Sequence, residues 1–569
     1  MQRYITTPIY YVNDRPHIGH CYTTLVADCM ARFERLRGTG PVFFLTGTDE
    51  HADKVVTSAQ ANGMTAIQWA DRNAAEFAKA FAFINASNDD FIRTTQDRHK
   101  TRVIEYVSAM IKSGAIYPGT YEGWYDENQE EYLTETVAKD QDYKSSVTGK
   151  PLVRRSEKCY FFKLSAYQSR LEKHFADNPT FVQPDARRNE VLGRLRDGLN
   201  DVPISRPVTD DPATQFGIRV PGDEQHRIYV WIDALFNYLS VVDTDDRRTF
   251  WPSASGASTC THFIAKDILW FHAVIWPAML MALRDTAAHG TRFDFVGLPT
   301  TVYSHAYWVR EGRKMSKSLK NFIEIEQLQA YANKFSLDAV RWYLLTQGPL
   351  NATDADFSHS KFVEVYNADL ANGIGNCTSR VGNMIEKYFG TLPDPTKIPE
   401  SDALNCIPLH VPEAQRTTWR EFFATIRNRL SITEDAGRIP AVAFDVNGDM
   451  SALHLNAMNI VRTVDDYISK TAPFKLAKTV DQNPAAKDQL AAILYNCAEA
   501  LRIASILLSP AMPQKMAQVW HAWNCTPPAN VPLAELCEFA GKHALKPGQT
   551  IAKGEVLFMR ADTAEAAPA

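Results

Sequence analysis

The pattern of apolar positions in the first fifty residues predicts a strand, a helix and a second strand. Residues 3–12 are rich in Ile, Tyr, Thr and Val, the composition of a buried strand. After a break at NDRP, apolar residues recur at helical spacing from Ile18 to Phe33, and Gly38 is placed to end the helix. Residues 41–46, PVFFLT, then indicate a strand that ends in a polar turn, GTDEH. This order is a βαβ unit, so we expect a parallel sheet.

The rest of the chain divides by composition. A charged, turn-rich stretch with one helical run near residues 164–175 is predicted to be an insertion, and strand and helix patterns of the first type resume after it. Later the pattern is almost entirely helical, and apolar residues between Ala491 and Leu508 predict a helix with a broad buried face. The expected boundaries are 1–116 and 223–325 for two halves of an α/β domain, 117–222 for the insertion, 326–358 for a linker region, 359–540 for a helical domain, and 541–569 for a C-terminal hairpin and disordered tail.

The composition is that of an ordinary globular protein. The 569 residues include 61 Lys and Arg against 66 Asp and Glu, a formal charge of -5, which excludes a wholly cationic surface but not a local basic site. The nine cysteines contain no Cys-x2-Cys pair, which argues against a zinc knuckle and a disulfide framework. The N-terminus lacks a signal-peptide pattern, and the most apolar stretch, residues 271–283, is too short to span a bilayer. We therefore expect a cytoplasmic protein without a membrane segment.

A first candidate site lies at the start of the first helix, in the sequence PHIGH at residues 16–20. A helix N-terminus presents free backbone N–H groups and a partial positive charge, which suit a phosphate. His17 and His20 are three residues apart and share a face of the helix, and Gly19 removes a side chain where a ligand could approach. The alternative is a pair of histidines that only cap or pack the helix, and for this short motif taken alone it is the more common case.

A second candidate site is the basic segment RKMSKSLKN at residues 313–321. Its four cations without an acid suit a polyanion such as a triphosphate. Solvated surface loops often have the same composition, so the segment alone is ambiguous. The two motifs in this order, with the first on a strand-to-helix turn, are far more specific together than either is alone.

Together these motifs resemble the HIGH and KMSKS signatures of the class I aminoacyl-tRNA synthetases. Longer segments, TTPIYYVNDRPHIGH, FFLTGTDEH, YVWIDAL, HFIAKDI and HAYWVREGRKMSKSLKN, are similar to the methionyl-tRNA synthetase family. The similarity extends from residue 3 to about residue 560. It implies an α/β fold with a Rossmann-type class I catalytic domain and an inserted connective domain, then a region that contacts the tRNA stem, and finally an all-α anticodon-binding helix bundle.

The resemblance implies a two-step reaction. The carboxylate of L-methionine attacks the α-phosphate of ATP, which gives methionyl-adenylate and pyrophosphate, and the methionyl group then passes to the terminal adenosine of tRNA(Met). Charge builds on phosphate oxygens in the first transition state, so fixed hydrogen-bond donors are useful catalysts. Gly19 and Asp267 are expected to complete the ATP site, and Mg²⁺ to be held largely by the phosphates. The catalytic residues expected are His17, His20, Lys314 and Lys317, and of these His17, His20 and Lys317 are also expected to bind ATP.

Asp267, in the segment IAKDI, matches a family aspartate near the ATP ribose. Two residues before it, Ala265 replaces the usual glycine, and the extra methyl group is expected to alter the fit of the nucleotide. A helix N-cap is the competing role for this aspartate.

The amino-acid pocket has to hold an ammonium group and a flexible thioether. Asp49 resembles the family residue that pairs with the ammonium, and a turn aspartate is the alternative. A thioether packs well on aromatic rings, and the resemblance places the backbone N–H of Ile9 and the hydroxyl of Tyr238 near the sulfur, with Trp276 behind the wall. Homocysteine is the expected competitor. The methionine-binding residues expected are Ile9, Tyr11, Asp49, Trp231, Ala234, Leu235, Tyr238, Ile268 and His272.

Residues 367–384 of the helical region carry two stripes at helical spacing. A polar stripe of Asn372, Asn376 and Arg380 suits hydrogen bonding to unstacked base edges, although a solvated helix face is the simpler explanation from the residues alone. The resemblance identifies these positions as contacts of the CAU anticodon. It also identifies Phe474, where tryptophan is usual, as an aromatic that stacks on an anticodon base, with burial in the bundle as the alternative. The apolar stripe consists of Leu370, Ile374, Cys377, Val381 and Met384.

Two departures from the family lead to further expectations. Many members carry zinc knuckles in the insertion, whereas this chain has only Cys159 there, so no structural zinc is expected. No appended tRNA-binding domain fits after residue 540, and because such domains often dimerise the protein, we expect a monomer. Two other functions stay open. The first is an enzyme that makes an adenylate without charging tRNA, which the long helical region argues against. The second is a non-catalytic tRNA-binding protein, which the intact motifs argue against.

Overall fold

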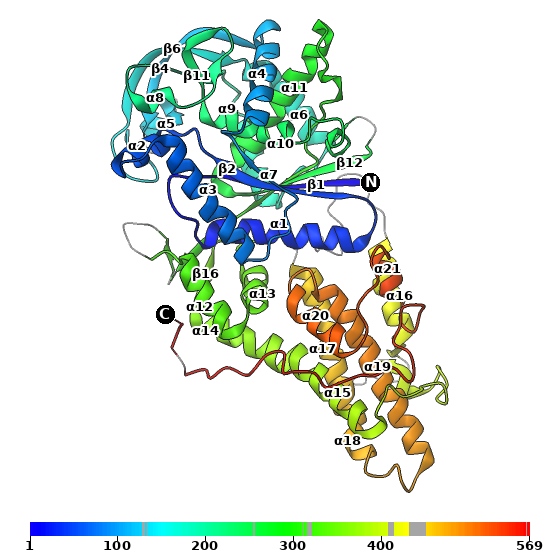
Figure 1. Ribbon diagram of the computed structural model, residues 1–569. Helices are drawn as coiled ribbons and strands as arrows, with labels where there is room; N and C mark the ends of the chain where they lie inside the picture. The colour runs from blue at the N-terminus through cyan, green and yellow to red at the C-terminus, as the bar shows by residue number, and fades with distance from the viewer. Residues whose placement is uncertain are drawn as a thin grey trace.

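Figure 1 shows the computed structural model, in which an α/β domain built on a parallel sheet is followed by a largely helical domain. The structure describes residues 1–127, 131–133, 135–253, 256–310, 312–315, 321–407, 415–431, 451–564 and 566–568. The N-terminus enters the sheet directly, and the C-terminal segment runs back along the helical domain (Figure 1).

Six strands form the central sheet, in the order β3-β2-β1-β12-β13-β7. Every neighbouring pair in it is parallel, as the βαβ pattern predicts. Because parallel strands all end at the same edge, residues far apart in the chain meet there. The strands are β1 (Gln2–Tyr11), β2 (Val42–Asp49), β3 (Asp90–Arg93), β7 (Val182–Gln183), β12 (Ser258–Ala265) and β13 (Thr301–His305).

The helix α1 (Ile18–Arg37) connects β1 to β2 and lies along the sheet with most of its residues buried (Figure 1). It ends where predicted, because Gly38 adopts a left-handed conformation with φ 68° and its N–H bonds to the Arg35 carbonyl. The predicted strand, helix and strand are therefore confirmed. The other main helices of this domain are α2 (Asp53–Ala61), α3 (Ala66–Phe83), α4 (Asp97–Lys112), α9 (Val230–Leu235), α10 (Asn237–Ser240) and α11 (Trp276–Asp285).

The predicted insertion at 117–222 is not one separate block. Strands from both of its ends, together with β11 just after it, form two small antiparallel sheets, in the orders β5-β4-β6-β8 and β10-β11-β9. The stretch between them returns to the central sheet, where Val182 of β7 pairs with Val302 at the edge. A strand of two residues has no periodicity that the sequence could reveal. The elements are β4 (Ile116–Asp126), β5 (Glu131–Leu133), α5 (Glu135–Asp140), β6 (Val153–Phe162), α6 (Gln168–Asp177), α7 (Asp185–Leu195), β8 (Val202–Pro203), β9 (Ser205–Pro207), α8 (Pro212–Gln215), β10 (Arg219–Val220) and β11 (Asp223–Ile228).

A small sheet and two helices connect the α/β domain to the helical domain. The sheet has the order β15-β14-β16, and the helices α12 and α13 follow β15 in the chain. The predicted linker, residues 326–358, contains most of α12, all of α13 and β16, whereas β14 and β15 lie before it, in the predicted second half of the α/β domain. The elements of this connection are β14 (Trp308–Arg310), β15 (Arg313–Lys314), α12 (Ile325–Phe335), α13 (Leu337–Gln347) and β16 (Ala355–Phe357).

The last part of the chain is helical, as predicted. Its central helix, α19 (Pro484–Leu508), is the one described helix that is long and apolar enough to cross a membrane by length and composition, and its most apolar stretch is entirely buried in the protein. The other elements are α14 (His359–Val365), the π-helix η7 (Tyr366–Gly375), α15 (Asn376–Phe389), β17 (Cys406–Ile407), β18 (Thr417–Thr418), α16 (Trp419–Ser431), α17 (Ser451–Thr471), α18 (Pro473–Leu476), α20 (Pro513–Ala522) and α21 (Leu533–Leu536).

The predicted C-terminal hairpin is wrong. Within the described part of residues 541–569 no strands pair, and the chain instead runs extended along the helical domain (Figure 1). The hydroxyl of Tyr366 donates to the Met559 carbonyl at 2.7 Å, and Asn367 exchanges two hydrogen bonds with the backbone of Ala561. The side chain of Phe558 is buried. Phe558 packs against Tyr366, so this segment is held by a helix and not by pairing with itself.

Candidate active site

A cavity of about 780 Å³ opens at the carboxyl ends of β1, β2, β12 and β13. This is the edge where open parallel sheets bind ligands. The cavity gathers every predicted site residue of the catalytic domain other than the two lysines of the basic segment. They are Ile9, Tyr11, His17, Gly19, His20, Asp49, Trp231, Ala234, Leu235, Tyr238, Asp267, Ile268 and His272.

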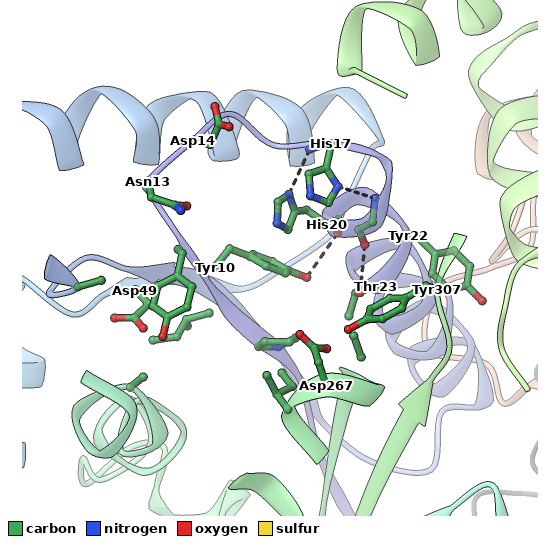
Figure 2. Close-up of a pocket in the computed structure, with 18 of the residues that line it drawn as sticks. Tyr10, Asn13, Asp14, His17, His20, Tyr22, Thr23, Asp49, Asp267 and Tyr307 are labelled. Atoms are coloured by element: carbon green, nitrogen blue, oxygen red, sulfur yellow. Dashed lines mark hydrogen bonds between the residues drawn. The ribbon is translucent and has the colours of Figure 1, made fainter. Parts of the chain in front are cut away.

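Both motif histidines cap α1 and also face the cavity. The backbone N–H of Gly19 donates to Nδ1 of His17 at 3.1 Å, and the backbone N–H of His17 donates to Nδ1 of His20 at 3.1 Å (Figure 2). Because Nδ1 accepts in each ring, a neutral ring must carry its proton on Nε2. Capping of the helix, which the sequence alone offered as the alternative to ligand binding, is therefore compatible with it. The cap leaves Nε2 of each ring as a hydrogen-bond donor.

The environment keeps His20 neutral. Burial lowers its pKa well below the usual range, and the neighbouring ring of His17, with its centroid 3.9 Å away, lowers it further. Gly19 leaves room for this arrangement, because a Cβ there would lie 3.0 Å from Cε1 of His17 and the ring would have to shift by a few tenths of an ångström. The structure thus gives a reason for this glycine that the sequence did not.

At the other end of the cavity Tyr238 and His272 form a buried pair. Nδ1 of His272 lies 2.9 Å from the Ile268 carbonyl and must donate to it, so Nε2 accepts the hydroxyl proton of Tyr238 at 2.8 Å. Burial lowers the pKa of His272 to about 4, only partly offset by the Ile268 carbonyl. His272 lies in a π-helical turn, Phe271–Ile275, which periodicity did not predict.

Aromatic rings line the wall beside this pair. Trp231 stacks on Phe271 with ring centroids 4.2 Å apart and meets Tyr11 edge to face at 6.0 Å. Trp276 is fully buried and packs against Tyr238 at 6.0 Å, in the supporting position that the sequence predicts. Phe271 supports Trp231 without being among the residues that line the cavity, and this role was not predicted because an aromatic in an apolar helix has the pattern of a core residue.

Asp267 faces the cavity from the turn after β12 and lies beside Tyr307 (Figure 2). It is not a helix N-cap, since that position of the short 3₁₀ helix Lys266–Ile268 is held by Ala265. Burial raises the pKa of Tyr307, and the charge of Asp267 and a hydrogen bond to it raise it further. Ala265 is among the residues that line the cavity. Tyr307, His305 and Thr23 were missed; His305 ends β13, and the end of a parallel strand is the kind of position where a site residue is expected.

The basic segment is only partly within the described residues. Lys314 belongs to β15, in which it pairs with Val309, and its side chain lies outside the described part, as does the whole of Lys317. The chain that follows the segment does reach the first motif. The ring of Phe322 lies 4.9 Å from that of His17, and the N–H of Ile18 donates to the Ile323 carbonyl at 3.1 Å.

The candidate anticodon residues lie in the helical domain, on η7, α15 and α18, at the end of the molecule away from the sheet (Figure 1). Asn372 is exposed, Asn376 is half-buried, and Arg380 forms an ion pair with Asp465 at 2.8 Å. Phe474 is 44% exposed, so the alternative of burial in the bundle does not hold. The apolar stripe is buried as predicted, but the single regular helix is wrong, because residues 366–375 are π-helical with a break at Gly373.

Several buried histidines make the fold sensitive to acid. Burial lowers the pKa of His272 and His305 to about 4, and the pKa of His20 and His262 well below the usual range. The unfolded chain takes up a proton on each of these histidines near pH 6.5, whereas in the folded chain His272 and His305 do so only near pH 4 and the pKa values of His20 and His262 are also lowered. Stability is therefore full above about pH 6.5 and decreases as the pH falls toward 4, by an amount on the order of 3 kcal/mol for each of His272 and His305.

Chemical unfolding followed between pH 7.5 and 4.5 is expected to show this loss. The variant His262→Gln, which cannot titrate, is expected to have a shallower dependence on pH. A free energy of unfolding that is constant over this range would contradict the assignment of neutral buried histidines.

Comparisons with known proteins agree with this site. The family model of the class I (M) tRNA synthetases matches residues 3–141 and 136–382. The methionine–tRNA ligase of Streptomyces coelicolor is 38% identical over 573 residues, which cover 99% of this chain and 97% of that protein. The methionine–tRNA ligase of Bacillus subtilis is 33% identical and covers 99% of this chain and 78% of its own length.

A solved structure gives the same result for the fold. The methionyl-tRNA synthetase of Mycobacterium tuberculosis, in complex with methionyl-adenylate, superimposes with a TM-score of 0.81 at 31% identity and covers 98% of this chain and 99% of its own. The match includes both the α/β domain and the helical domain, as the sequence predicts for an α/β catalytic domain followed by a helical one. The chain therefore belongs to the methionine–tRNA ligase family of class I aminoacyl-tRNA synthetases, the enzymes that activate methionine with ATP and join it to tRNA.

Proposed function

We propose that the cavity at the carboxyl ends of β1, β2, β12 and β13 carries out the activation of L-methionine by ATP. The observation that supports this most directly is that thirteen residues chosen from four separate stretches of the sequence line one cavity. In the reaction a methionine carboxylate oxygen bonds to the α-phosphorus of ATP while the bond to the β-phosphate bridge breaks, which releases pyrophosphate. The methionyl group then passes to the terminal adenosine of tRNA(Met).

The two motif histidines would bind the triphosphate as neutral donors. Each ring uses Nδ1 as an acceptor within the helix cap, which leaves Nε2–H for a phosphate oxygen. Such donors stabilise charge that develops in the transition state without having to reorganise. Lys314 and Lys317 are proposed to assist the two histidines. The contacts of Ile18 and His17 with residues 322–323 support this, because they hold the C-terminal end of the basic segment beside the first motif.

The other end of the cavity would bind methionine. Asp49 at the end of β2 is proposed to pair with the ammonium group, and the rings of Tyr11 and Trp231 to pack on the thioether. Asp267 is proposed to bind the ATP ribose, which its place beside Tyr307 supports. Ile9, Ala234, Leu235, Tyr238, Ile268 and His272 would complete the methionine pocket, and Gly19 the ATP site.

Mg²⁺ is proposed to enter with ATP and to be held by the phosphates. Among the described residues no group of three or more His, Cys, Asp or Glu side chains could hold a metal ion. A magnesium ion that is bound mainly through substrate phosphates needs no such group.

The function is tested by ATP–pyrophosphate exchange with each of the twenty amino acids in the absence of tRNA. Exchange that depends on methionine alone is expected, because the site contains both the adenylate-forming groups and one amino-acid pocket. Exchange with a different amino acid would contradict the proposed pocket, and no exchange at all would contradict the proposed catalytic groups.

We propose that the helical domain reads the CAU anticodon through Asn372, Asn376, Arg380 and Phe474. The exposed ring of Phe474 and the exposed or half-buried polar side chains support this, since single-stranded bases are bound by stacking and by hydrogen bonds to their edges. Asp465 would hold the Arg380 guanidinium in place through their ion pair.

Substituting Phe474 by alanine is expected to lower kcat/KM for tRNA charging by about 5- to 150-fold, since stacking on one base contributes about 1–3 kcal/mol. Substituting Arg380 by alanine is expected to lower it as well, through the loss of hydrogen bonds to base edges. ATP–pyrophosphate exchange should not change, because neither residue is near the cavity. Arg462→Ala is a matched control: its ion pair with Asp369 is also in the helical domain, and charging by this variant is expected to stay near normal. An equal loss in both assays would mean that Arg380 and Phe474 are structural.

The expected absence of structural zinc remains a prediction. The turn from Tyr143 to Leu152 closes by backbone hydrogen bonds, among them Ser145 N–H to the Lys150 carbonyl at 2.7 Å and Leu152 N–H to the Tyr143 carbonyl at 2.8 Å. Metal analysis of the purified protein is expected to find no stoichiometric zinc, and one zinc per chain would contradict this.

We also propose that the protein is a cytoplasmic monomer. The mass in solution, measured by light scattering, is expected to be that of one chain of 64.0 kDa. Twice this mass would contradict the proposal.

A further inference from the structure

Asp49 lies between two residues whose side chains are fixed by buried hydrogen bonds. The carboxylate of Glu50 accepts from Nε and Nη2 of Arg93 at 2.7 and 3.0 Å, and from the Thr48 hydroxyl at 2.7 Å. His51, on the other side, is buried and directs its ring to a different part of the domain. The backbone that carries Asp49 is therefore held from both sides.

The partner of His51 is Asp233, which is 1% exposed. Nδ1 of His51 lies 2.6 Å from one carboxylate oxygen of Asp233, and Nε2 of His99 lies 2.8 Å from the other. Nδ1 of His99 lies 2.8 Å from the hydroxyl of Ser240. Burial by itself raises the pKa of Asp233, but the two histidines outweigh it and lower the pKa to about 2, so the buried carboxylate is ionised.

This chain of contacts joins the two halves of the proposed methionine pocket. His51 follows Asp49 at the end of β2, whereas Asp233 lies on α9 between Trp231 and Ala234, which line the cavity. Ser240 lies on α10, the helix that carries Tyr238. The ammonium side of the pocket and its apolar wall are thus connected through one carboxylate.

A buried carboxylate is costly unless its partners are well placed, and apolar residues would fill the same space more simply. We propose that Asp233 and His51 are positioning residues for methionine: their hydrogen bond sets the distance from Asp49 to the wall on α9, so that one substrate meets both at once. This inference rests on the proposed methionine pocket. The residues act through Asp49, Trp231 and Ala234 and do not themselves line the cavity.

The test is ATP–pyrophosphate exchange by the full-length protein with two variants of His51. His51→Leu removes the donor to Asp233 and is expected to raise the KM for methionine by about tenfold or more, since a hydrogen bond to a charged group contributes about 1.5–3 kcal/mol. The KM for ATP should stay within about twofold, because the nucleotide end has no part in this network. His51→Asn places an amide N–H where Nδ1 was and is expected to restore most of the methionine affinity.

Tyr106→Phe is the matched control. The Tyr106 hydroxyl donates to the buried Asp243 at 2.9 Å, and Tyr106 lies on the same helix as His99, α4. The variant therefore loses an equivalent hydrogen bond to a buried carboxylate outside the network of Asp233. Its KM for methionine should not change. If His51→Leu does not fold, Asp233→Asn makes the same comparison. If wild-type exchange depends on methionine, then equal rises in the KM values for methionine and ATP, or an unchanged KM for methionine, would overturn the positioning role and leave the proposed function intact. Wild-type exchange without that dependence would instead refute the proposed function and the inference with it.

Discussion

Replacing His20 with asparagine is expected to lower the rate of methionine-dependent ATP–pyrophosphate exchange by about 100- to 1,000-fold, the usual loss for one fixed donor to a developing oxyanion. An asparagine side chain reaches as far as Nδ1 of the ring, so it can still accept the N–H of His17 and keep the helix cap. It does not reach the position of Nε2, so the cavity loses a donor. Pre-steady-state formation of methionyl-adenylate, measured with saturating ATP, isolates this step.

Replacing His20 with glutamine makes the opposite change. With its amide at the position of Nε2, glutamine keeps a donor in the cavity but no longer accepts the His17 N–H; the rotamer that does accept it, as Gln68 does for Thr65 in α3, withdraws the donor. We expect more residual activity in His20→Gln than in His20→Asn, together with a lower free energy of unfolding, by about 1 kcal/mol for a lost cap. If the asparagine variant is the more active one, His20 acts through the cap, and its proposed contact with ATP is wrong.

The local parts of the fold could be predicted because local patterns determine them. Strand β1, helix α1 and strand β2 follow from apolar spacing, and the helix ends at Gly38 because the left-handed conformation there favours glycine. Strand β7 could not be predicted, because its two residues are ordered only by pairing with β13. The same holds for the C-terminal segment, whose extended course depends on Tyr366 and Asn367 of a distant helix.

The candidate site follows a similar division. Residues within recognisable segments, such as His17 and Asp49, do line the cavity. Asp233 was within one of these segments and was still passed over, because its role depends on His51 and His99, which no spacing in the sequence brings near it. The π-helical turns at Phe271–Ile275 and Tyr366–Gly375 were also missed, since apolar periodicity does not distinguish them from α-helix.

Contacts of one buried side chain also connect the two domains. Arg341 of α13 is 1% exposed on its side chain and pairs with the fully buried Asp28 of α1 at 2.7 Å. Its other N–H groups donate to the carbonyls of Ala511 and Pro510, which follow the central helix of the helical domain, and to that of Ile84, which follows α3. One guanidinium therefore connects the catalytic domain, the linker region and the helical domain.

Substituting Arg341 by methionine is expected to lower the free energy of unfolding by about 3–5 kcal/mol, because Asp28 is left as a buried charge with less compensation. Arg170→Ala, which breaks the half-exposed ion pair with Asp285, is the control and should cost less than about 1 kcal/mol. Urea unfolding followed by circular dichroism measures both. The double variant Asp28→Asn with Arg341→Met should cost less than the sum of the single changes, since the unpaired charge is then absent. Additive losses, or a loss as small as that of the control, would show that this ion pair does not hold the domains together.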